Sequence, residues 1–277
     1  SKGFLDYLRN FKFQCDVWAV PEGTAVFPGE PIVTIRGPVV QAQLIETMTL
    51  LLLNHQTLIA TKANRIVRAA EGRPVAEFGS RRAQGSSGAI YGAKAAYIGG
   101  CAGTACTIVD RDFGIDAKGT MAHSWVQSFD NEYEAFKTYA KTYPDNCVFL
   151  VDTYNTLKSG IPNAIKVFKE CKPKNMGIRI DSGDVAYLTK KARQMLDDAG
   201  LKDCTIMVSN SLDEYLIREV LSQGACIDAF GVGERLITAK SQPVFGGVYK
   251  LAAIEKNGKI IPKIKVSENV EKITNPG

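Results

Sequence analysis

The apolar stretch Cys147-Val148-Phe149-Leu150-Val151 decides the fold class, because a continuous apolar run of this length is typical of a strand buried on both faces. A helix-like run follows at 162–170, and a second strand-like run, Met176-Gly177-Ile178-Arg179-Ile180, comes after it. Strand, helix and strand in this order are typical of parallel strands joined by crossover helices. The stretch therefore predicts an α/β fold.

The same alternation continues on both sides of this stretch. Further strands are expected at 74–78, 117–121, 205–208 and 227–230, and further helices at 85–99, 104–109, 132–143, 185–199 and 212–223. A doubly wound sheet fits this pattern, and so does a barrel. The residues that follow the strands, described below, favour the barrel.

The two ends of the chain have a different pattern. Short strands are expected at 13–20, 25–27 and 31–35, and a strand at 245–254 that turns back at Asn257-Gly258 into Ile260-Ile261. A helix is expected at 41–70. We therefore expect a β-rich domain from residues 1–45 and 240–277, beside an α/β barrel domain over 46–239.

Composition narrows the class of protein. Of the 277 residues, 45% are hydrophobic and 23% are charged, as in ordinary globular proteins. The net charge of +5 is spread along the chain among acidic residues, so we expect no nucleic-acid partner. Apolar runs such as 50–53 are too short to span a membrane, and the chain opens without an apolar signal region. The seven cysteines form no CxxC pair, and together these features favour a reducing compartment, the cytoplasm.

Residues suited to binding a ligand, most of them polar, follow every strand of the predicted run. They include Phe78, Arg81 and Arg82 with their neighbours, then Thr120 and His123, Asp152, Thr153 and Asn155, Arg179, Asp181 and Asp184, Ser209 and Asn210, and Gly231 and Gly233. Ligands bind at the carboxyl ends of parallel strands, and an open sheet needs such endings only near its switch point. Endings on all strands are better explained by a barrel with one mouth.

These residue types fit a phosphorylated ligand with an aromatic acid. Arg81, Arg82 and Arg179 can grip carboxylate or phosphate, and Phe78 offers a flat face. Gly231 and Gly233 offer backbone N–H groups to a phosphate. Asp181 and Asp184 are candidates to bind hydroxyls or a hard cation such as Mg²⁺.

His123, one of only two histidines, is the candidate reactive group. Histidine is the side chain type that ordinarily titrates near neutrality, and Thr120 and Ser124 add hydroxyls beside the ring. A capping or packing role is the alternative. Similar alternatives stay open for the other motifs: a solvated Arg81-Arg82 pair, a turn and helix cap at 181–184, a structural His55, and a Gly-x-Gly that lacks the third glycine of a dinucleotide fingerprint. The chain has no GxxxxGK[ST] motif, so any ATP binds without a Walker loop.

Four motifs, in this order, resemble the nicotinate phosphoribosyltransferase family over nearly the whole chain. They are Glu77-Phe78-Gly79-Ser80-Arg81-Arg82-Ala83-Gln84-Gly85, Gly119-Thr120-Met121-Ala122-His123-Ser124-Trp125, Arg179-Ile180-Asp181-Ser182-Gly183-Asp184 and Phe245-Gly246-Gly247-Val248-Tyr249-Lys250-Leu251. The resemblance implies an irregular TIM-like α/β barrel beside a β-rich domain formed from both chain ends.

The resemblance also implies an activity. The expected reaction joins nicotinate and phosphoribosyl pyrophosphate into nicotinate mononucleotide and pyrophosphate, as in NAD salvage. It implies Mg²⁺, ATP hydrolysis coupled through a phosphohistidine, and a homodimer with shared sites. The small-molecule partners are then nicotinate, phosphoribosyl pyrophosphate and ATP.

Site residues carry over position by position. His123 matches the phosphorylated histidine, Phe78 the ring that stacks on nicotinate, and Asp181 an acid near the ribose. Arg82, Thr120 and Arg179 match groups around the pyridine carboxylate and the diphosphate, with Arg81 sharing the role of Arg82. Gly231 and Gly233 match the loop for the 5′-phosphate.

Other functions stay open from the sequence. The family's chains extend beyond both Ser1 and Gly277, so a chain trimmed at both ends is expected. The alternatives are a nicotinamide or quinolinate phosphoribosyltransferase and a truncated, non-catalytic barrel that binds phosphoribosyl ligands.

Overall fold

The computed structural model describes residues 1–266 and divides the chain into two compact units. Unit 1 consists of Ser1–Asn54 with the chain from Phe245 on, and unit 2 is His55–Val244. The sequence prediction drew these limits at 45 and 240. The last part of its β-rich domain, 267–277, lies outside the described residues.

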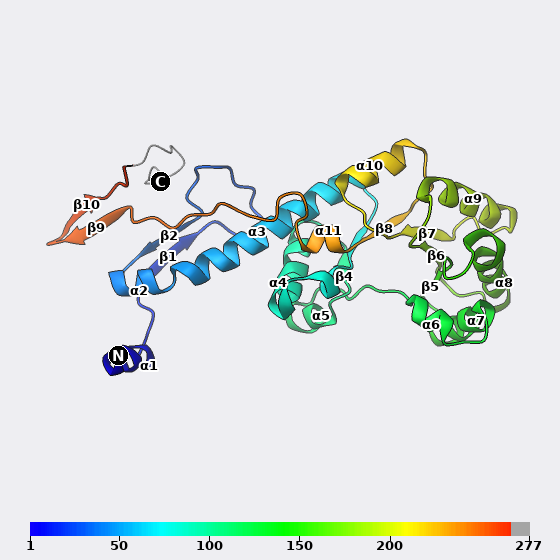
Figure 1. The fold of residues 1–277 in the computed structure, drawn as a ribbon, viewed down its shortest axis with the longest axis horizontal. Coiled ribbons are helices and arrows are strands. Elements are labelled where there is room, and N and C mark those ends of the chain that lie inside the picture. The colour runs from blue at the N-terminus through cyan, green and yellow to red at the C-terminus, as the bar shows by residue number, and fades with distance from the viewer. Residues whose placement is uncertain (267–277) are drawn as a thin grey trace. The chain divides into compact units, whose positions relative to one another are not determined.

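A six-stranded parallel sheet, curled into a half-barrel, forms the centre of unit 2 (Figure 1). The sheet confirms the predicted α/β class. Its strands, in spatial order, are β4 (Gly103–Thr104), β3 (Val75–Glu77), β8 (Ala229–Val232), β7 (Thr205–Val208), β6 (Met176–Ile180) and β5 (Cys147–Leu150). Within the described part of the chain, β4 and β5 are the two edges of the sheet. Because all six strands run in the same direction, their carboxyl ends open on one side.

Helices connect the strands of unit 2. They are the part of α3 (Glu46–Ala69) from His55 on, α4 (Gly85–Ile98), α5 (Thr107–Phe113), α6 (His123–Gln127), α7 (Glu132–Thr142), α8 (Ile161–Cys171), α9 (Val185–Asp198), α10 (Glu214–Ser222) and α11 (Glu234–Ile237). A 3₁₀ turn, η1 (Ser80–Arg82), follows β3, and a π turn, η2 (Thr156–Gly160), precedes α8. Short polar side chains begin three of the helices by accepting backbone N–H groups: Asn131 for α7, Asp184 for α9 and Asp213 for α10.

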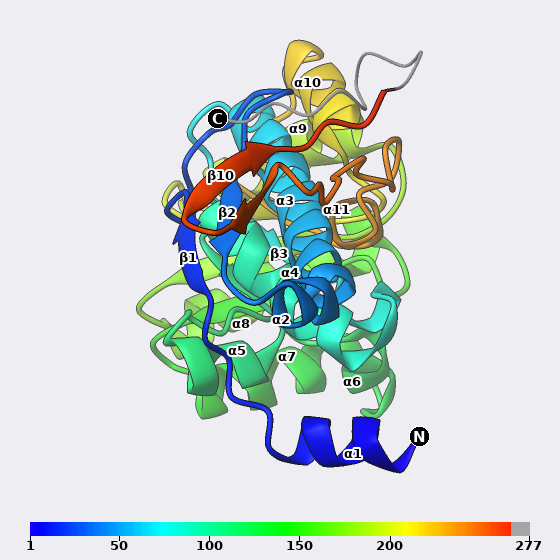
Figure 2. The ribbon, with the colours of Figure 1, turned by 90° about the vertical axis from the view of Figure 1, so that its left-hand side faces the viewer.

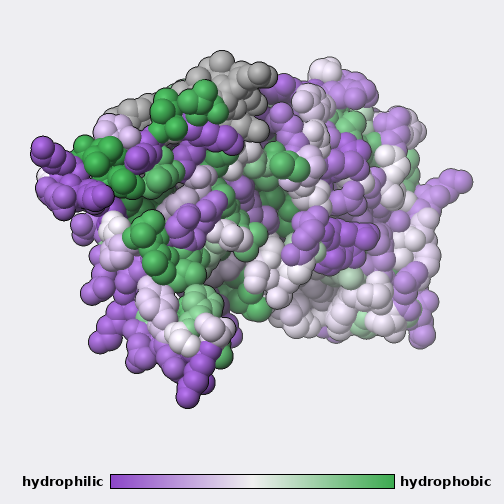
Figure 3. Space-filling model, turned by 60° about the vertical axis from the view of Figure 1, so that its left-hand side comes forward, coloured by the Kyte–Doolittle hydropathy of each residue, from purple (hydrophilic) through white to green (hydrophobic). Residues whose placement is uncertain are grey.

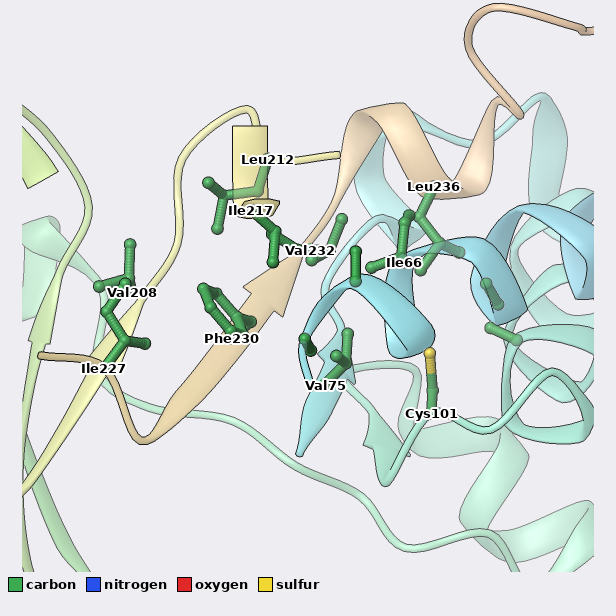
Figure 4. Packing of buried hydrophobic residues seen from close by; sticks show 14 of the residues in the cluster. Ile66, Val75, Cys101, Val208, Leu212, Ile217, Ile227, Phe230, Val232 and Leu236 are labelled. Carbon is green, nitrogen blue, oxygen red and sulfur yellow. The ribbon is translucent and has the colours of Figure 1, made fainter. Parts of the chain in front are cut away.

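Of the three buried apolar clusters among the described residues, one lies around α4 and α5, and two include residues of the sheet strands. One of these two lies around β5 and β6, where the Phe149 ring stacks between Phe136 and Phe168 at 4.6 Å from each. The other lies around β8 and β3 and includes Phe230, with Ile66 from α3 (Figure 4). The predicted burial of the stretch 147–151 is confirmed, since four of its residues are fully buried and Val148 is partly buried.

One strand of the sheet was assigned to the wrong segment. No strand forms at 117–121, where Ala117 makes only a single bridge to Thr104. The sixth strand is instead β4, at the start of the segment 104–109 that was predicted as helix. Helix α5 begins at Thr107 rather than at Thr104. The sequence did not predict this strand, because two residues are too few to show an alternation of apolar and polar side chains.

In the residues that the structure describes, unit 1 consists of two separate antiparallel strand pairs and three helical segments. Strand β1 (Asp16–Ala19) pairs with β2 (Val33–Arg36), and β9 (Ala253–Lys256) pairs with β10 (Lys259–Pro262). The helical segments are α1 (Lys2–Arg9), α2 (Val39–Leu44) and the first part of α3. Figure 2 shows α1 apart from the β1–β2 hairpin. The helix α1 was not predicted, although Ser1 caps it by accepting the N–H of Phe4 at 3.3 Å.

Two predicted strands of unit 1 are wrong. Residues 25–27 form no strand, because the Pro28-Gly29 turn follows at once. Residues 245–252 form none either, and β9 begins only at Ala253. Gly246 and Gly247 weaken strand character in this segment. The predicted turn at Asn257-Gly258 is confirmed, with φ of 53° and 73°, and the hairpin resumes in β10.

Contacts from both chain ends join within unit 1. Arg36 pairs with Glu255 at 2.7 Å, and the Tyr249 hydroxyl donates to the carbonyl of Ala42 at 2.9 Å.

Many large apolar side chains of this unit are exposed, among them Trp18 at 55% and Leu51 at 68%. In the view of Figure 3, several exposed apolar groups, in green, lie among hydrophilic ones. None of the helices in residues 1–266 has the length and apolar character that a membrane crossing requires.

Candidate active site

The carboxyl ends of the strands in unit 2 bring together most of the residues that the sequence singled out. Phe78 follows β3, Asp152 and Thr153 follow β5, Asp181 follows β6, and Ser209 follows β7. Two further groups lie at the start of α6. Thr120 is in the irregular segment before this helix, and His123 is its first residue. The arrangement agrees with the predicted mouth of a barrel.

Arg179 is the most highly connected side chain of this cluster. Its Nε donates to the Ser209 hydroxyl at 2.7 Å, its Nη1 to the Thr120 hydroxyl at 2.8 Å, and its Nη2 to Asp181 Oδ1 at 2.9 Å. Its guanidinium carbon lies 5.6 Å from the centre of the Phe78 ring. The cation is therefore fixed among the ends of three strands and beside a flat aromatic face.

The His123 ring lies between hydroxyl and carboxylate groups. Its Nδ1 is 3.1 Å from the Thr153 hydroxyl, and its Nε2 is 3.7 Å from Asp181 Oδ2 and 3.9 Å from Asp152 Oδ1. The side chain is 40% exposed, so a ligand has access to it. This exposure favours a position facing a ligand over the capping or packing alternative.

Asp152 is buried beneath this ring, with its side chain only 1% exposed. Its Oδ2 accepts the backbone N–H of Asp181 at 2.9 Å and the Ser182 hydroxyl at 2.5 Å. Its Oδ1 is buried without a hydrogen-bond partner among the described residues. An unpaired buried carboxylate oxygen is costly, so its position beside His123 points to a functional contact.

The charge of Asp181 is also held in place by its neighbours. Burial works to raise the pKa of its carboxyl. The hydrogen bond from Ser209, the bond and charge of Arg179 and the charge of His123 outweigh burial and bring the pKa below its ordinary value. Asp181 therefore stays ionised next to His123, as an acid that stabilises positive charge would need to be.

Glycines make room for the Phe78 ring and its turn. A Cβ on Gly231 would lie 2.6 Å from two carbons of that ring, and a Cβ on Gly233 would lie 3.2 Å from the Phe78 carbonyl oxygen. Gly231 lies inside β8 and pairs with Ala76, while Gly233 is the residue before α11. The expected loop for a phosphate thus begins later than the sequence suggested, after Val232.

Glu77, the last residue of β3, fixes the same turn from below. It is fully buried, accepts the N–H of Gly79 and accepts the Thr104 hydroxyl at 2.6 Å. Burial raises the pKa of this carboxyl, and the two hydrogen bonds oppose that effect only in part. Glu77 therefore ties β3 to β4 directly behind Phe78.

Other predicted site residues stand apart from this cluster. Arg81 and Arg82 lie exposed in η1, and Ser124 is exposed on α6. Asn210 is exposed after β7 with a left-handed φ of 105°. Asp184 caps α9 by accepting the N–H of Tyr187 at 3.0 Å, so the capping interpretation describes this residue.

Four residues of the site received no role from the sequence: Glu77, Asp152, Thr153 and Ser209. Each of them ends a strand or follows one closely, and that position was the available signal. Their partners lie about thirty residues away along the chain, at separations of 27 to 30. Such pairings depend on strand register, which one sequence does not supply.

The side chains of this cluster that could bind a metal ion are the carboxylates of Asp152 and Asp181. Residues 1–266 contain no group of three or more His, Cys, Asp or Glu side chains placed to hold a metal ion by themselves. Asp152 Oδ1 and Asp181 Oδ2 nevertheless lie near the same ring nitrogen, and Asp152 Oδ1 has no hydrogen-bond partner among these residues. Two such oxygens fit Mg²⁺, which takes one or two carboxylates and completes its shell with substrate phosphates.

The half-barrel and its strand-end cluster of Arg179, Asp181, Asp152 and His123 define an α/β protein equipped to bind an anionic ligand beside an aromatic face. Comparisons with known proteins agree with this class. Residues 74–274 match the nicotinate phosphoribosyltransferase (NAPRTase) family, and residues 1–54 match the N-terminal domain of nicotinate phosphoribosyltransferase. The chain belongs to the nicotinate phosphoribosyltransferase family.

Two named relatives show the extent of the similarity. A nicotinate phosphoribosyltransferase of Bacillus subtilis (strain 168) is 52% identical over 262 residues, which are 94% of this chain and 53% of that protein. Nicotinate phosphoribosyltransferase pncB2 of Mycobacterium tuberculosis (strain ATCC 25618 / H37Rv) is 43% identical over 261 residues, which are 94% of this chain and 56% of that protein. The chain thus spans about half the length of these curated relatives.

Solved structures show the same fold. The crystal structure of human nicotinic acid phosphoribosyltransferase matches with a TM-score of 0.77 and 27% identity, over 84% of this chain and 58% of that one. The crystal structure of nicotinate-nucleotide pyrophosphorylase from Pyrococcus furiosus matches with a TM-score of 0.73 and 29% identity, over 90% of this chain and 65% of that one.

Proposed function

We propose that the protein carrying this sequence is a nicotinate phosphoribosyltransferase, which forms nicotinate mononucleotide and pyrophosphate from nicotinate and phosphoribosyl pyrophosphate. Family membership and the names of the relatives support this activity. The observation that carries it is the joining of Arg179, Phe78 and Asp181 at the strand ends of unit 2. The cation suits a carboxylate or a phosphate, the ring suits a pyridine, and the acid suits a ribose.

The chemistry asked of these residues is mainly electrostatic. The bond from ribose C1 to the diphosphate oxygen breaks, its electron pair leaves with pyrophosphate, and the ribose becomes oxocarbenium-like. The nicotinate ring nitrogen then supplies the pair for the new bond at C1. Asp181, kept ionised, stabilises the positive ribose, and Arg179 holds an anionic group of the ligands. Mg²⁺, held by Asp181, Asp152 and substrate phosphates, would offset charge on the diphosphate.

ATP coupling is proposed to run through His123. The γ-phosphoryl group of ATP would pass to a nitrogen of this ring, giving ADP and phosphohistidine, and water would later release phosphate. The exposure of the ring and its position between Thr153, Asp152 and Asp181 support this role.

The choice of base is proposed to depend on two cationic groups: Arg179, which faces the pyridine carboxylate, and Arg82, which adds positive charge from the turn after Phe78. Arg82 lies in η1, which directly follows Phe78 and Gly79. Arg82→Ala should then weaken nicotinate much more than nicotinamide, because only nicotinate carries a negative charge. An equal loss for both bases would remove Arg82 from the carboxylate site. Steady-state kinetics with each base makes this comparison.

We further propose a homodimer in the cytoplasm. The exposed apolar side chains of unit 1, such as Trp18 and Leu51, support a self-association surface. Sedimentation equilibrium of the parent and of Trp18→Ser would test this. A concentration-independent monomer mass for the parent would contradict it.

A further inference from the structure

We propose that Ser209 sets the discrimination between a pyridine carboxylate and a pyridine carboxamide, by fixing the direction in which Arg179 presents its free N–H groups. The proposal rests on the proposed function, because it concerns the base which that reaction uses. Ser209 is only 4% exposed and directly follows β7. Its backbone N–H donates to the carbonyl of Ile180 at 3.0 Å, so the residue has a fixed place in the sheet.

The Ser209 hydroxyl connects two charged groups of opposite sign. It accepts the Nε–H of Arg179 at 2.7 Å and donates its own proton to Asp181 Oδ1. The same Asp181 oxygen accepts from Arg179 Nη2 at 2.9 Å. Serine, aspartate and one edge of the guanidinium thus form a closed ring of hydrogen bonds, in which each group has one preferred orientation.

Thr120 completes the fixation of the guanidinium from the other side, at 2.8 Å from Nη1. An arginine side chain has five N–H donors, and these three contacts use one on each nitrogen. Among the described residues, one donor on Nη1 and one on Nη2 are left for a ligand. Phe78 lies on the face of the same group, 5.6 Å away, and keeps it from swinging to that side.

A guanidinium fixed in this way distinguishes the two bases by hydrogen-bond chemistry. A carboxylate offers only acceptors, so both of its oxygens can meet the free N–H groups. A carboxamide turns an NH₂ donor toward one of them, and a donor facing a donor leaves both without a partner. A mobile arginine would avoid this conflict by turning away. Ser209 prevents that movement and so maintains the difference in affinity.

The test compares Ser209→Ala with the parent by titrating nicotinate and nicotinamide in a calorimeter. We expect the Kd for nicotinate to rise on the order of tenfold, as for loss of one hydrogen bond to a charged group. The Kd for nicotinamide should change by less than about twofold, because that base already lacks the paired contact. Ser209→Thr, which keeps the hydroxyl, should retain most of the parent's preference.

Thr205→Ala is the matched control, because Thr205 is at the opposite end of the same strand and donates only to the carbonyl of Met176, at 3.3 Å. It should leave both Kd values unchanged. Equal losses for the two bases in Ser209→Ala, or no loss for nicotinate, would overturn the specificity role. If the parent binds neither base, the proposed function itself fails. A melting curve for each variant shows that it is folded.

Discussion

Asp152 Oδ1 lies 3.9 Å from Nε2 of His123 and is buried without a hydrogen-bond partner among residues 1–266. The two oxygens of this carboxylate have different tasks. Oδ2 fixes the turn at Asp181 and Ser182, while Oδ1 is directed toward the ring. The structure therefore links Asp181, the proposed acid near the ribose, to the proposed phosphohistidine through one buried residue.

Asp152→Asn tests this link. The amide keeps one acceptor for the turn and removes the negative charge beside His123. We expect the ATP-stimulated part of the rate to fall on the order of a hundredfold, the typical worth of a group assisting proton transfer. The slow ATP-independent reaction should fall less, because Asp181 and the substrate phosphates still hold Mg²⁺ when Asp152 loses its charge. Asp116→Asn is the control, because Asp116 is 74% exposed. Loss of both rates in equal proportion would contradict a role for Asp152 on His123.

Gly231→Ala tests the packing of the Phe78 ring. The new Cβ would come to 2.6 Å from Cδ2 and Cε2 of Phe78, so the ring or the strand must move. Overpacking of this kind costs about 1–3 kcal/mol of unfolding free energy. We expect this loss of unfolding free energy, measured by urea unfolding, and weaker nicotinate binding, measured by calorimetry.

Gly246→Ala serves as the control for this substitution, because no atom lies within 4 Å of the added Cβ. It should leave the unfolding free energy within about 0.5 kcal/mol of the parent. Unchanged nicotinate binding in Gly231→Ala would show that the ring position does not depend on this glycine.

Much of the fold was predictable because apolar runs and short polar caps are local signals. The run at 147–151 and the helix starts at Asn131 and Asp184 are examples. The strand β4 was not predictable from two residues, Gly103 and Thr104, whose pairing depends on Ala76 and Glu77. Likewise, the position of Ser209 in the site depends on the register between β6 and β7, which one sequence does not supply.

Glu77→Gln tests the buried acid behind Phe78 by its pH dependence. Since burial raises the pKa of Glu77, the native state keeps the proton to higher pH than the unfolded chain does. The stability contributed by this group is therefore fully present below the ordinary carboxyl pKa and is lost as the pH rises through the raised value.

The variant lacks this titration, so the unfolding free energy of Glu77→Gln minus that of the parent should become more positive as the pH rises from about 4 to about 7. Urea unfolding at a series of pH values measures the difference. A difference that stays flat, or becomes more negative, would show that Glu77 has no raised pKa.

Lys62 and Glu214 form a buried ion pair in unit 2, at 2.7 Å with each side chain 4% exposed. Lys62→Met leaves the carboxylate buried without its cation and should cost about 3–5 kcal/mol of unfolding free energy. Adding Glu214→Gln to this variant should recover much of that loss, because no unpaired charge then stays buried. Urea unfolding of the single and double variants measures both effects.

The exposed pair of Lys240 and Glu234, at 3.5 Å, provides the control for this comparison. Lys240→Ala should cost less than about 1 kcal/mol, because solvent screens an exposed pair. If Lys62→Met costs no more than this control, the buried pair does not stabilise the unit.

Pyrophosphate release from phosphoribosyl pyrophosphate and Mg²⁺, with nicotinate and with or without ATP, tests the central claim most directly. It is measured for the parent and for His123→Ala. We predict release by the parent, faster with ATP, and a slower release by His123→Ala that ATP does not change. Absence of release with nicotinate would contradict the proposed reaction, and equal stimulation by ATP in both proteins would contradict the phosphohistidine.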